Sequence, residues 1–365
     1  MKIKEIIQPL ERIAPLSLQE NYDNAGLIIG NGETQCTGIL TSLDVTESVV
    51  EEAVKRNCNL IVAHHPIIFR GIKKLNGKNY VERTVISAIK NNMAVYAIHT
   101  NLDNIVEGVN KMIADKLNLQ NCKTLLPKEG MLRKLVTFSP VKNAEEIRHA
   151  LFKAGAGAIG KYDECSFNID GKGTFRAGEG SHPFVGEIGQ QHFENETRIE
   201  VIFPSFLQNK ILGSLKEVHP YEEVAYYIQN LENVQENVGS GLIGELKSAI
   251  SENELLNILK GSFKLSVIKH TGFLGKPLSK IALCGGAGNF LLPHAIAAGA
   301  QVYITSDIKY HEFFDADNRI LLCDIGHYES EQFTIDLLTE FLKEKFANFA
   351  VLKTEISTNP VNYFS

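Results

Sequence analysis

The chain has 365 residues, of which 44% are hydrophobic, and this is enough for two or three domains with large buried cores. Its formal net charge of −6 disfavours a general electrostatic attraction to nucleic acid. The six cysteines lack CxxC spacing, and the chain shows neither a signal-peptide core nor an apolar segment of transmembrane length, which predicts a cytoplasmic protein with free thiols and no membrane contact.

The first third of the chain alternates between short helices and short apolar strands. Apolar residues at helical spacing predict a helix from Ile3 to Ile13. We expect strands at 38–44, 60–63 and 93–98, each followed by a helix, at 46–54, 80–91 and 104–117. Thr46 suits the N-cap of the first of these three helices. This alternation indicates parallel βαβ units.

The middle of the chain, from 128 to 246, has a different pattern and no cluster of metal-binding residue types. The expected order is strand, helix, two strands, helix and strand, at 135–139, 144–153, 166–175, 197–204, 206–218 and 223–231. This order is typical of a ferredoxin-like α+β domain. We therefore predict that residues 128–246 form an inserted domain.

The last third returns to the α/β pattern. Strands are expected at 281–284, 302–304 and 320–323, with a helix at 290–298 and a long amphipathic helix at 328–345. We predict an α/β protein in which two related halves, 1–127 and 247–365, face each other, form one core, and are interrupted by the inserted domain.

Imidazole and carboxylate groups follow three of the expected strands. His64-His65-Pro66 follows the strand at 60–63, and His99 and Asp103 follow the strand at 93–98. His327 and Glu331 follow the strand at 320–323. Ligands of open α/β sheets bind at the carboxyl ends of strands, and five or six nitrogen and oxygen donors meeting there suit a metal cluster.

Each of these residues alone has a simpler interpretation. A histidine at a strand end is more often a turn residue, Asp103 suits a helix N-cap, and His327 with Glu331 suits a surface pair four residues apart. The coincidence of three segments favours the metal site. Pro66 takes the chain out of strand geometry, which allows His64 and His65 to act together.

Further residues near the strand ends have two interpretations each. The loop 285–289 suits a phosphate cradle or a simple tight turn. Arg70, Lys73 and Lys74 suit an anion site or a solvated charged loop. Asp307 and His311 are candidates for orienting or acid–base groups, and His99 is the preferred candidate for a catalytic residue.

Six motifs together resemble the NIF-three-like family of dinuclear metal hexamers, whose members are named type 2 homologues of GTP cyclohydrolase I. They are Tyr22-Asp23-Asn24-Ala25-Gly26-Leu27, His64-His65-Pro66, His99-Thr100-Asn101-Leu102-Asp103, Cys284-Gly285-Gly286-Ala287-Gly288, Thr305-Ser306-Asp307 and Gly326-His327-Tyr328-Glu329-Ser330-Glu331. The resemblance covers 1–127 and 246–365. Tyr22 stands where many members carry Trp, which affects no ligand.

The resemblance implies two divalent metal ions per subunit. Their ligands are the residues that match the family's metal-binding positions: His64, His65, Asp103, His327 and Glu331. Five ligands cannot fill two coordination shells, so one carboxylate should bridge the ions, and Glu331 is our choice because its helix also carries His327. Zinc is the preferred metal, with iron, manganese, nickel and cobalt as alternatives. The resemblance also implies a PII/CutA-like insertion and a homohexamer of two stacked trimers.

The leading functional hypothesis is a metal-dependent hydrolase of the cyclohydrolase or phosphoesterase type. A hydroxide held by the metals would attack a carbon or phosphorus atom of a nucleotide-like or phosphorylated small molecule. The alternative is a non-catalytic regulatory hexamer that senses metal or ligand, in which His219 of the insertion would bind the regulator rather than pack at a helix end. A ring that encloses nucleic acid is disfavoured by the acidic balance and the absence of Trp.

Overall fold

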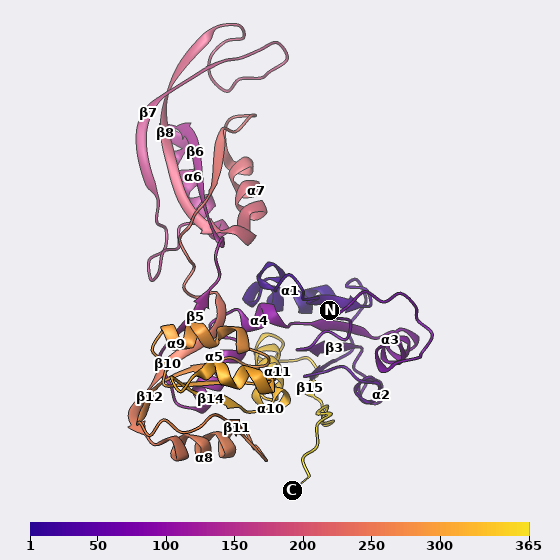
Figure 1. Ribbon diagram of the computed structural model, residues 1–365. Coiled ribbons are helices and arrows are strands. Elements are labelled where there is room, and N and C mark those ends of the chain that lie inside the picture. The colour runs from indigo at the N-terminus through magenta and orange to yellow at the C-terminus, as the bar shows by residue number, and fades with distance from the viewer. Residues whose placement is uncertain (365) are drawn as a thin grey trace. The chain divides into compact units, whose positions relative to one another are not determined.

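The computed structural model describes residues 1–364 of the protein and divides it into two compact units (Figure 1). The core unit consists of Met1–Pro127 and the chain from Glu236 onward, and the inserted unit is Lys128–Gln235. The insertion therefore ends at Gln235 and not at 246, because strand β10 (Gly239–Ile250) pairs with strands β5 (Gln120–Pro127) and β12 (Leu278–Leu283) of the core unit.

The first sheet of the core unit has five strands. Their order is β1 (Gly26–Ile29), β4 (Ala94–Ala97), β3 (Leu60–Ala63), β2 (Ile39–Ser42) and β15 (Val351–Lys353). All neighbouring pairs are parallel except β1 with β4. Helix α2 (Glu47–Lys55) begins where predicted, with the Thr46 hydroxyl accepting a hydrogen bond from the backbone N–H of Val49 at 3.3 Å.

The second sheet of the core unit has six strands. Their order is β11 (Lys269–His270), β14 (Leu321–Asp324), β13 (Val302–Thr305), β12 (Leu278–Leu283), β10 and β5 (Gln120–Pro127). The pairs β12–β13 and β13–β14 are parallel, and the other pairs are antiparallel. Strand β5 comes from the first half of the chain but joins the second sheet, and β15 comes from the second half but joins the first sheet. Each half of the chain therefore contributes one strand to the sheet that the other half mainly forms.

Short helices connect and cover the strands. The remaining α-helices of the core unit are α1 (Ile3–Ile13), α3 (Tyr80–Lys90), α4 (Thr100–Asp103), α5 (Val109–Lys116), α8 (Glu252–Ser262), α9 (Leu292–Ala297), α10 (His327–Glu331) and α11 (Thr334–Lys345), and its 3₁₀ helices are η1 (Leu16–Leu18), η4 (Asn289–Leu291) and η5 (Tyr310–Ala316). Two predicted helices are thus shorter than expected, since 104–117 begins at Val109 and 328–345 is divided into α10 and α11. Asp103 ends α4, so the N-cap interpretation of this residue is wrong.

Within residues 1–364, none of the helices has the length and apolar character needed to cross a membrane.

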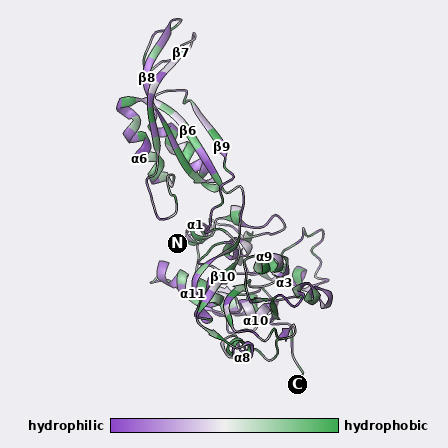
Figure 2. Ribbon diagram, turned by 60° about the vertical axis from the view of Figure 1, so that its left-hand side comes forward, coloured by the Kyte–Doolittle hydropathy of each residue, from purple (hydrophilic) through white to green (hydrophobic). Residues whose placement is uncertain are grey.

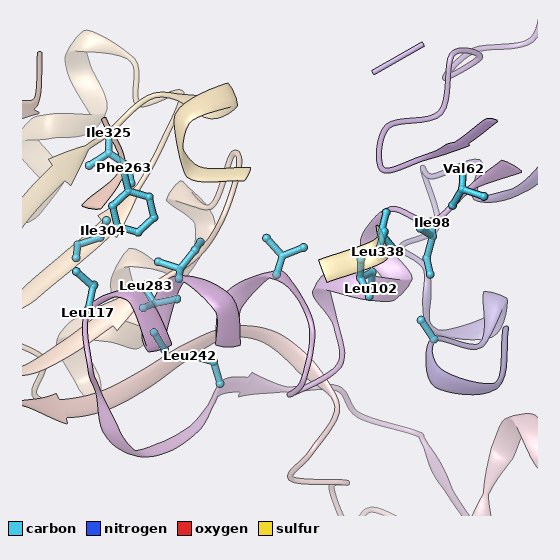
Figure 3. Close-up of a cluster of buried hydrophobic side chains, with 14 of the residues drawn as sticks. Val62, Ile98, Leu102, Leu117, Leu242, Phe263, Leu283, Ile304, Ile325 and Leu338 are labelled. Atoms are coloured by element: carbon cyan, nitrogen blue, oxygen red, sulfur yellow. The ribbon is translucent and has the colours of Figure 1, made fainter. Parts of the chain in front are cut away.

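Alternate residues of the buried strands face different hydrophobic clusters. Val62 and Tyr96 belong to the cluster that also receives side chains of the second sheet, whereas Ile61 and Val95 pack with α2 and α3 on the opposite face. Figure 3 shows the shared cluster, with Val62, Ile98, Leu102 and Leu338 in one group and Leu242, Leu283, Ile304 and Ile325 in the other. This continuous core fixes the two sheets relative to each other.

The inserted unit is a four-stranded antiparallel sheet with two α-helices. Its elements are β6 (Leu132–Pro140), η2 (Val141–Asn143), α6 (Ala144–Ala154), β7 (Phe167–Arg176), β8 (Gln191–Pro204), η3 (Ser205–Leu207), α7 (Gln208–Val218) and β9 (Tyr226–Asn230). The sheet order is β7-β8-β6-β9, and this β-α-β-β-α-β sequence of elements is the ferredoxin-like order. Figure 2 shows the alternation of hydrophobic and hydrophilic residues along β6 and β8 that lets one face pack against the helices.

Candidate metal centre

A cavity of about 980 Å³ in the core unit collects the strand-end residues of both sheets. Strands β2, β3 and β4 are parallel, so their carboxyl ends meet at one edge, and β12, β13 and β14 do the same in the second sheet. The residues lining the cavity include His65, His99 and Asp103 from the first half of the chain and His327 and Glu331 from the second. The layout predicted from sequence therefore produces one shared site.

Glu331 stands at the centre of the site, and its side chain is almost completely buried. Its Oε2 lies 3.0 Å from His65 Nε2 and 3.1 Å from His327 Nε2. The two imidazole nitrogens are only 3.4 Å apart. One carboxylate oxygen is thus shared by imidazoles from two different sheets, and the donor atoms of these three residues are close enough to hold one metal ion.

His64 and Asp103 each place a buried polar atom beside the central carboxylate. His64 is fully buried, and its Nδ1 donates to the carbonyl of Ile98 at 2.9 Å. Its Nε2 lies 3.7 Å from Asp103 Oδ1 and 3.9 Å from Glu331 Oε1, too far for hydrogen bonds. His64 Nε2 and Asp103 Oδ1 are both buried without a hydrogen-bond partner. Because buried polar atoms normally have partners, these donors fit divalent ions bound among them.

Three carboxylates orient three of the imidazoles. Asp44 Oδ1 accepts from His65 Nδ1 at 2.7 Å, and Asp307 Oδ2 accepts from His327 Nδ1 at 2.7 Å. Asp23 Oδ1 accepts from His99 Nδ1 at 2.8 Å. A carboxylate on one ring nitrogen fixes the tautomer and leaves Nε2 for a metal or a proton. The donor atoms of His64, His65 and His99 form a second group that is close enough to hold an ion, and the family resemblance assigns a ligand role to His64 and His65 but not to His99.

The electrostatics of the site call for cations. Burial opposes protonation of His65, but hydrogen bonds to Asp44 and Glu331 outweigh it and raise its pKa to about 9. Burial also acts on His327, yet its bonds to Asp307 and Glu331 raise the pKa to about 11. Burial and the nearby Glu331 charge raise the pKa of Asp103 well above its usual range. Without metal, protons on His65, His327 and Asp103 therefore offset the negative charge of the clustered carboxylates, which bound cations would otherwise offset.

Comparison with known proteins identifies the family. The sequence model described as Duf34/NIF3 (NGG1p interacting factor 3) matches residues 1–360. The chain belongs to the DUF34/NIF3 family. It is 38% identical over 363 residues to the "GTP cyclohydrolase 1 type 2 homolog" of Halalkalibacterium halodurans, covering 98% of both chains, and 34% identical to the Bacillus subtilis protein of the same name, covering 99% of this chain and 98% of the other.

Solved structures agree with the assignment to the DUF34/NIF3 family. The Bacillus cereus protein related to NIF3 superposes with a TM-score of 0.87 at 36% identity, covering 100% of this chain and 99% of the other. The family expected from the six motifs and the α/β fold class expected from the alternation of strands and helices are both confirmed.

The glycine loop of this DUF34/NIF3 member is a tight turn rather than a phosphate cradle. The N–H groups of Gly285, Gly286 and Gly288 donate to Asn110 Oδ1, Ser330 Oγ and Thr305 Oγ1 at 2.9, 3.0 and 2.9 Å. Gly286 has φ +62°, and a β-carbon there would overlap Glu331 Oε1. Glycine is thus required for the backbone to approach the central carboxylate.

Other residues singled out from the sequence lie away from the centre. Arg70, Lys73 and Lys74 are exposed, as is His311, and the cavity lining in the described part of the chain includes none of them. In the inserted unit, His219 donates from Nε2 to the carbonyl of Phe138 at 2.9 Å and accepts at Nδ1 from the N–H of Tyr221 at 3.1 Å. These contacts agree with the packing interpretation of His219.

Three residues that orient the site, Asp44, Asp23 and Thr358, were not predicted from the sequence. Asp44 shares the strand-end signal, because it follows β2 just as His64 follows β3. Asp23 precedes β1, and only the antiparallel pairing of β1 with β4 brings it to His99. Thr358, near the carboxyl terminus, donates to Asp44 Oδ2 at 2.6 Å. Asp23 and Thr358 are placed by strand pairing between segments far apart in the sequence, which no local sequence pattern reveals.

Replacement of Asp307 by asparagine is expected to weaken metal binding by about 10- to 100-fold, the usual effect of losing an orienting carboxylate. Asp307 has φ +57°, which asparagine tolerates, so the backbone should be unchanged. Zinc affinity measured by competition with a chromophoric chelator tests this expectation, with the exposed Asp315 replaced by asparagine as the control. Equal affinity in the two variants would contradict an orienting role.

Proposed function

We propose that the protein is a dinuclear metal-dependent hydrolase whose two divalent ions are held by His64, His65, Asp103, His327 and Glu331. The observation that carries the proposal is the pair of buried, unpartnered donors, His64 Nε2 and Asp103 Oδ1, beside the carboxylate that His65 and His327 share. Glu331 has one oxygen toward each side, with Oε1 nearer His64 and Oε2 nearer His65, which suits a bridging ligand. Zinc is the preferred metal because imidazoles dominate the donor set.

The bound ions and two sets of side chains would support hydrolysis. Two bound ions would lower the pKa of a water molecule and stabilise negative charge on the substrate. His99 contacts the His64 and His65 rings, with centroids 5.3 and 5.4 Å away, and Asp23 holds its Nδ1. In this proposal His99 is the catalytic residue that accepts or delivers a proton at Nε2. Asp44 and Asp307 keep the other imidazoles in the tautomer that binds a cation.

The proposed substrate is a nucleotide-like or phosphorylated small molecule. The name shared by the curated relatives points toward a purine nucleotide, and the cavity volume of about 980 Å³ accommodates a molecule of that size. We also propose a cytoplasmic homohexamer of two stacked trimers, an expectation that follows from the family resemblance. Sedimentation of the full chain measures this assembly directly.

The test of catalysis separates the metals from the proton-transfer group. Zinc-loaded protein should hydrolyse p-nitrophenyl phosphate, and His99→Gln should lower kcat by roughly 10²- to 10⁴-fold, the usual contribution of general acid–base catalysis, while about two ions are retained. His311→Ala is the matched control, since this exposed imidazole lies outside the cavity lining. Turnover that persists in metal-free protein, or that His99→Gln leaves unchanged, would refute the mechanism.

A further inference from the structure

The cavity around the candidate metal centre is strongly acidic. Seven of the residues that line it are Asp or Glu, and among the described residues of the lining Lys269 is the one Lys or Arg. Lys269 Nζ already pairs with the buried Asp324 at 2.5 Å. Two divalent ions would offset Asp103 and Glu331 and leave positive charge for one anionic group of a ligand. The other carboxylates would repel any further anionic group nearby.

The three glycine N–H groups of the loop 285–289 and the nearby cationic side chains are not available to bind a chain of phosphates. Phosphates are held by Arg and Lys side chains or by free backbone N–H groups. The N–H groups of Gly285, Gly286 and Gly288 donate to side chains of the same unit. Arg70, Lys73 and Lys74 are exposed on a loop outside the cavity lining. The second and third phosphates of a triphosphate would therefore meet carboxylates, and the one lysine of the described lining, Lys269, is already paired with Asp324.

Aromatic side chains form much of the remaining wall. Tyr22, Phe69, Tyr80 and Phe290 line the cavity, yet they are 68, 49, 61 and 58% exposed. They come from both halves of the chain, and the Phe69 ring meets the His99 ring edge-on, with centroids 5.4 Å apart. Exposed rings that surround a polar centre are typical of a site that binds a flat apolar or heteroaromatic group.

We propose that the ligand is a planar aromatic or heteroaromatic molecule with a single anionic or metal-binding group, and that nucleoside triphosphates are excluded. This inference rests on the proposed metal centre and specifies its substrate class. The anionic group meets the ions at the floor of the cavity, and the ring lies against the aromatic wall. A nucleoside monophosphate or an aromatic carboxylate has the required form.

Calorimetric titration of the zinc-loaded full chain with three non-hydrolysable or slowly hydrolysed probes tests the proposal. Phenylphosphonate has a ring and one anionic group, methylphosphonate lacks the ring, and tripolyphosphate has several anionic groups and no ring. Zinc content is measured before and after each titration. Phenylphosphonate should bind roughly tenfold tighter than methylphosphonate, as ring stacking predicts, and tripolyphosphate should bind no tighter than methylphosphonate.

Variants assign the expected difference to the aromatic wall. Phe290→Ala and Tyr22→Ala should remove most of the advantage of phenylphosphonate and leave methylphosphonate binding unchanged. Phe314→Ala, a similarly exposed ring outside the cavity lining, should have no effect. Equal binding of the two phosphonates, or tighter binding of tripolyphosphate, would overturn the ligand class and leave the metal centre standing. Retained zinc with no binding of either phosphonate would overturn both proposals, because the ions would have no open position.

Discussion

Replacement of His65 by alanine or of Glu331 by glutamine is expected to remove most of the bound metal from the protein. The Nε2 atoms of His65 and His327 both contact Glu331 Oε2, at 3.0 and 3.1 Å, so each substitution deletes a donor at the centre of the cluster. The loss of affinity should exceed the roughly 100-fold that loss of an orienting partner causes. Elemental analysis of protein purified without chelators should give about two ions per native chain and far fewer in both variants.

Two controls separate loss of ligands from loss of fold. His311→Ala removes an exposed imidazole and Glu340→Gln an exposed carboxylate, both from the second half of the core unit, and neither should change the metal content. Circular dichroism of the metal-free variants checks that the fold survives. Native protein that binds no ion when offered zinc, iron, manganese, nickel and cobalt in turn would disprove the assignment of the centre.

Local sequence patterns were sufficient to find the imidazoles. A buried strand followed by histidine places the side chain at the carboxyl edge of a parallel sheet, and His64, His65, His99 and His327 all lie there. Asp44 likewise follows a buried strand, β2, and could have been predicted from the sequence in the same way. The candidate site is predictable to this extent because strand burial and strand direction follow from local composition.

Non-local pairing accounts for what the sequence does not reveal. Nothing near Val351 indicates that β15 pairs with β2, or near Gln120 that β5 pairs with β10. The same limit applies to Asp23, which reaches His99 only through the pairing of β1 with β4. Helix ends were also missed, because the interruption at Gly108 depends on the close approach of the Leu102 carbonyl. Register and close contacts are properties of the folded chain.

Metal binding is expected to release protons and to strengthen as the pH rises. Without metal, hydrogen bonds to carboxylates raise the pKa of His65 to about 9 and that of His327 to about 11, so both are protonated at pH 7. Ions bind neutral imidazole, and each proton displaced makes the apparent affinity rise about tenfold per pH unit. Zinc affinity should thus rise about 100-fold per unit from pH 7 toward 9 and less steeply above. Calorimetry in buffers of different ionisation enthalpy counts the protons, and a count near zero would contradict this account.

The same pKa shifts predict that the thermal stability of the metal-free protein falls as the pH rises, whereas that of the zinc-loaded protein does not. A histidine whose pKa is raised in the folded state stabilises that state fully below its unfolded value of about 6.5, and this contribution is lost as the pH rises through the folded value. For His65 the loss falls between pH 6.5 and about 9, so the Tm of metal-free protein should decline across this window. Zinc-loaded protein should show no such decline, because its imidazoles are neutral throughout and bind more tightly as the pH rises. Scanning calorimetry of both forms across this pH range tests the prediction. If the Tm of the two forms changed with pH in parallel, His65 and His327 would not bind the ions.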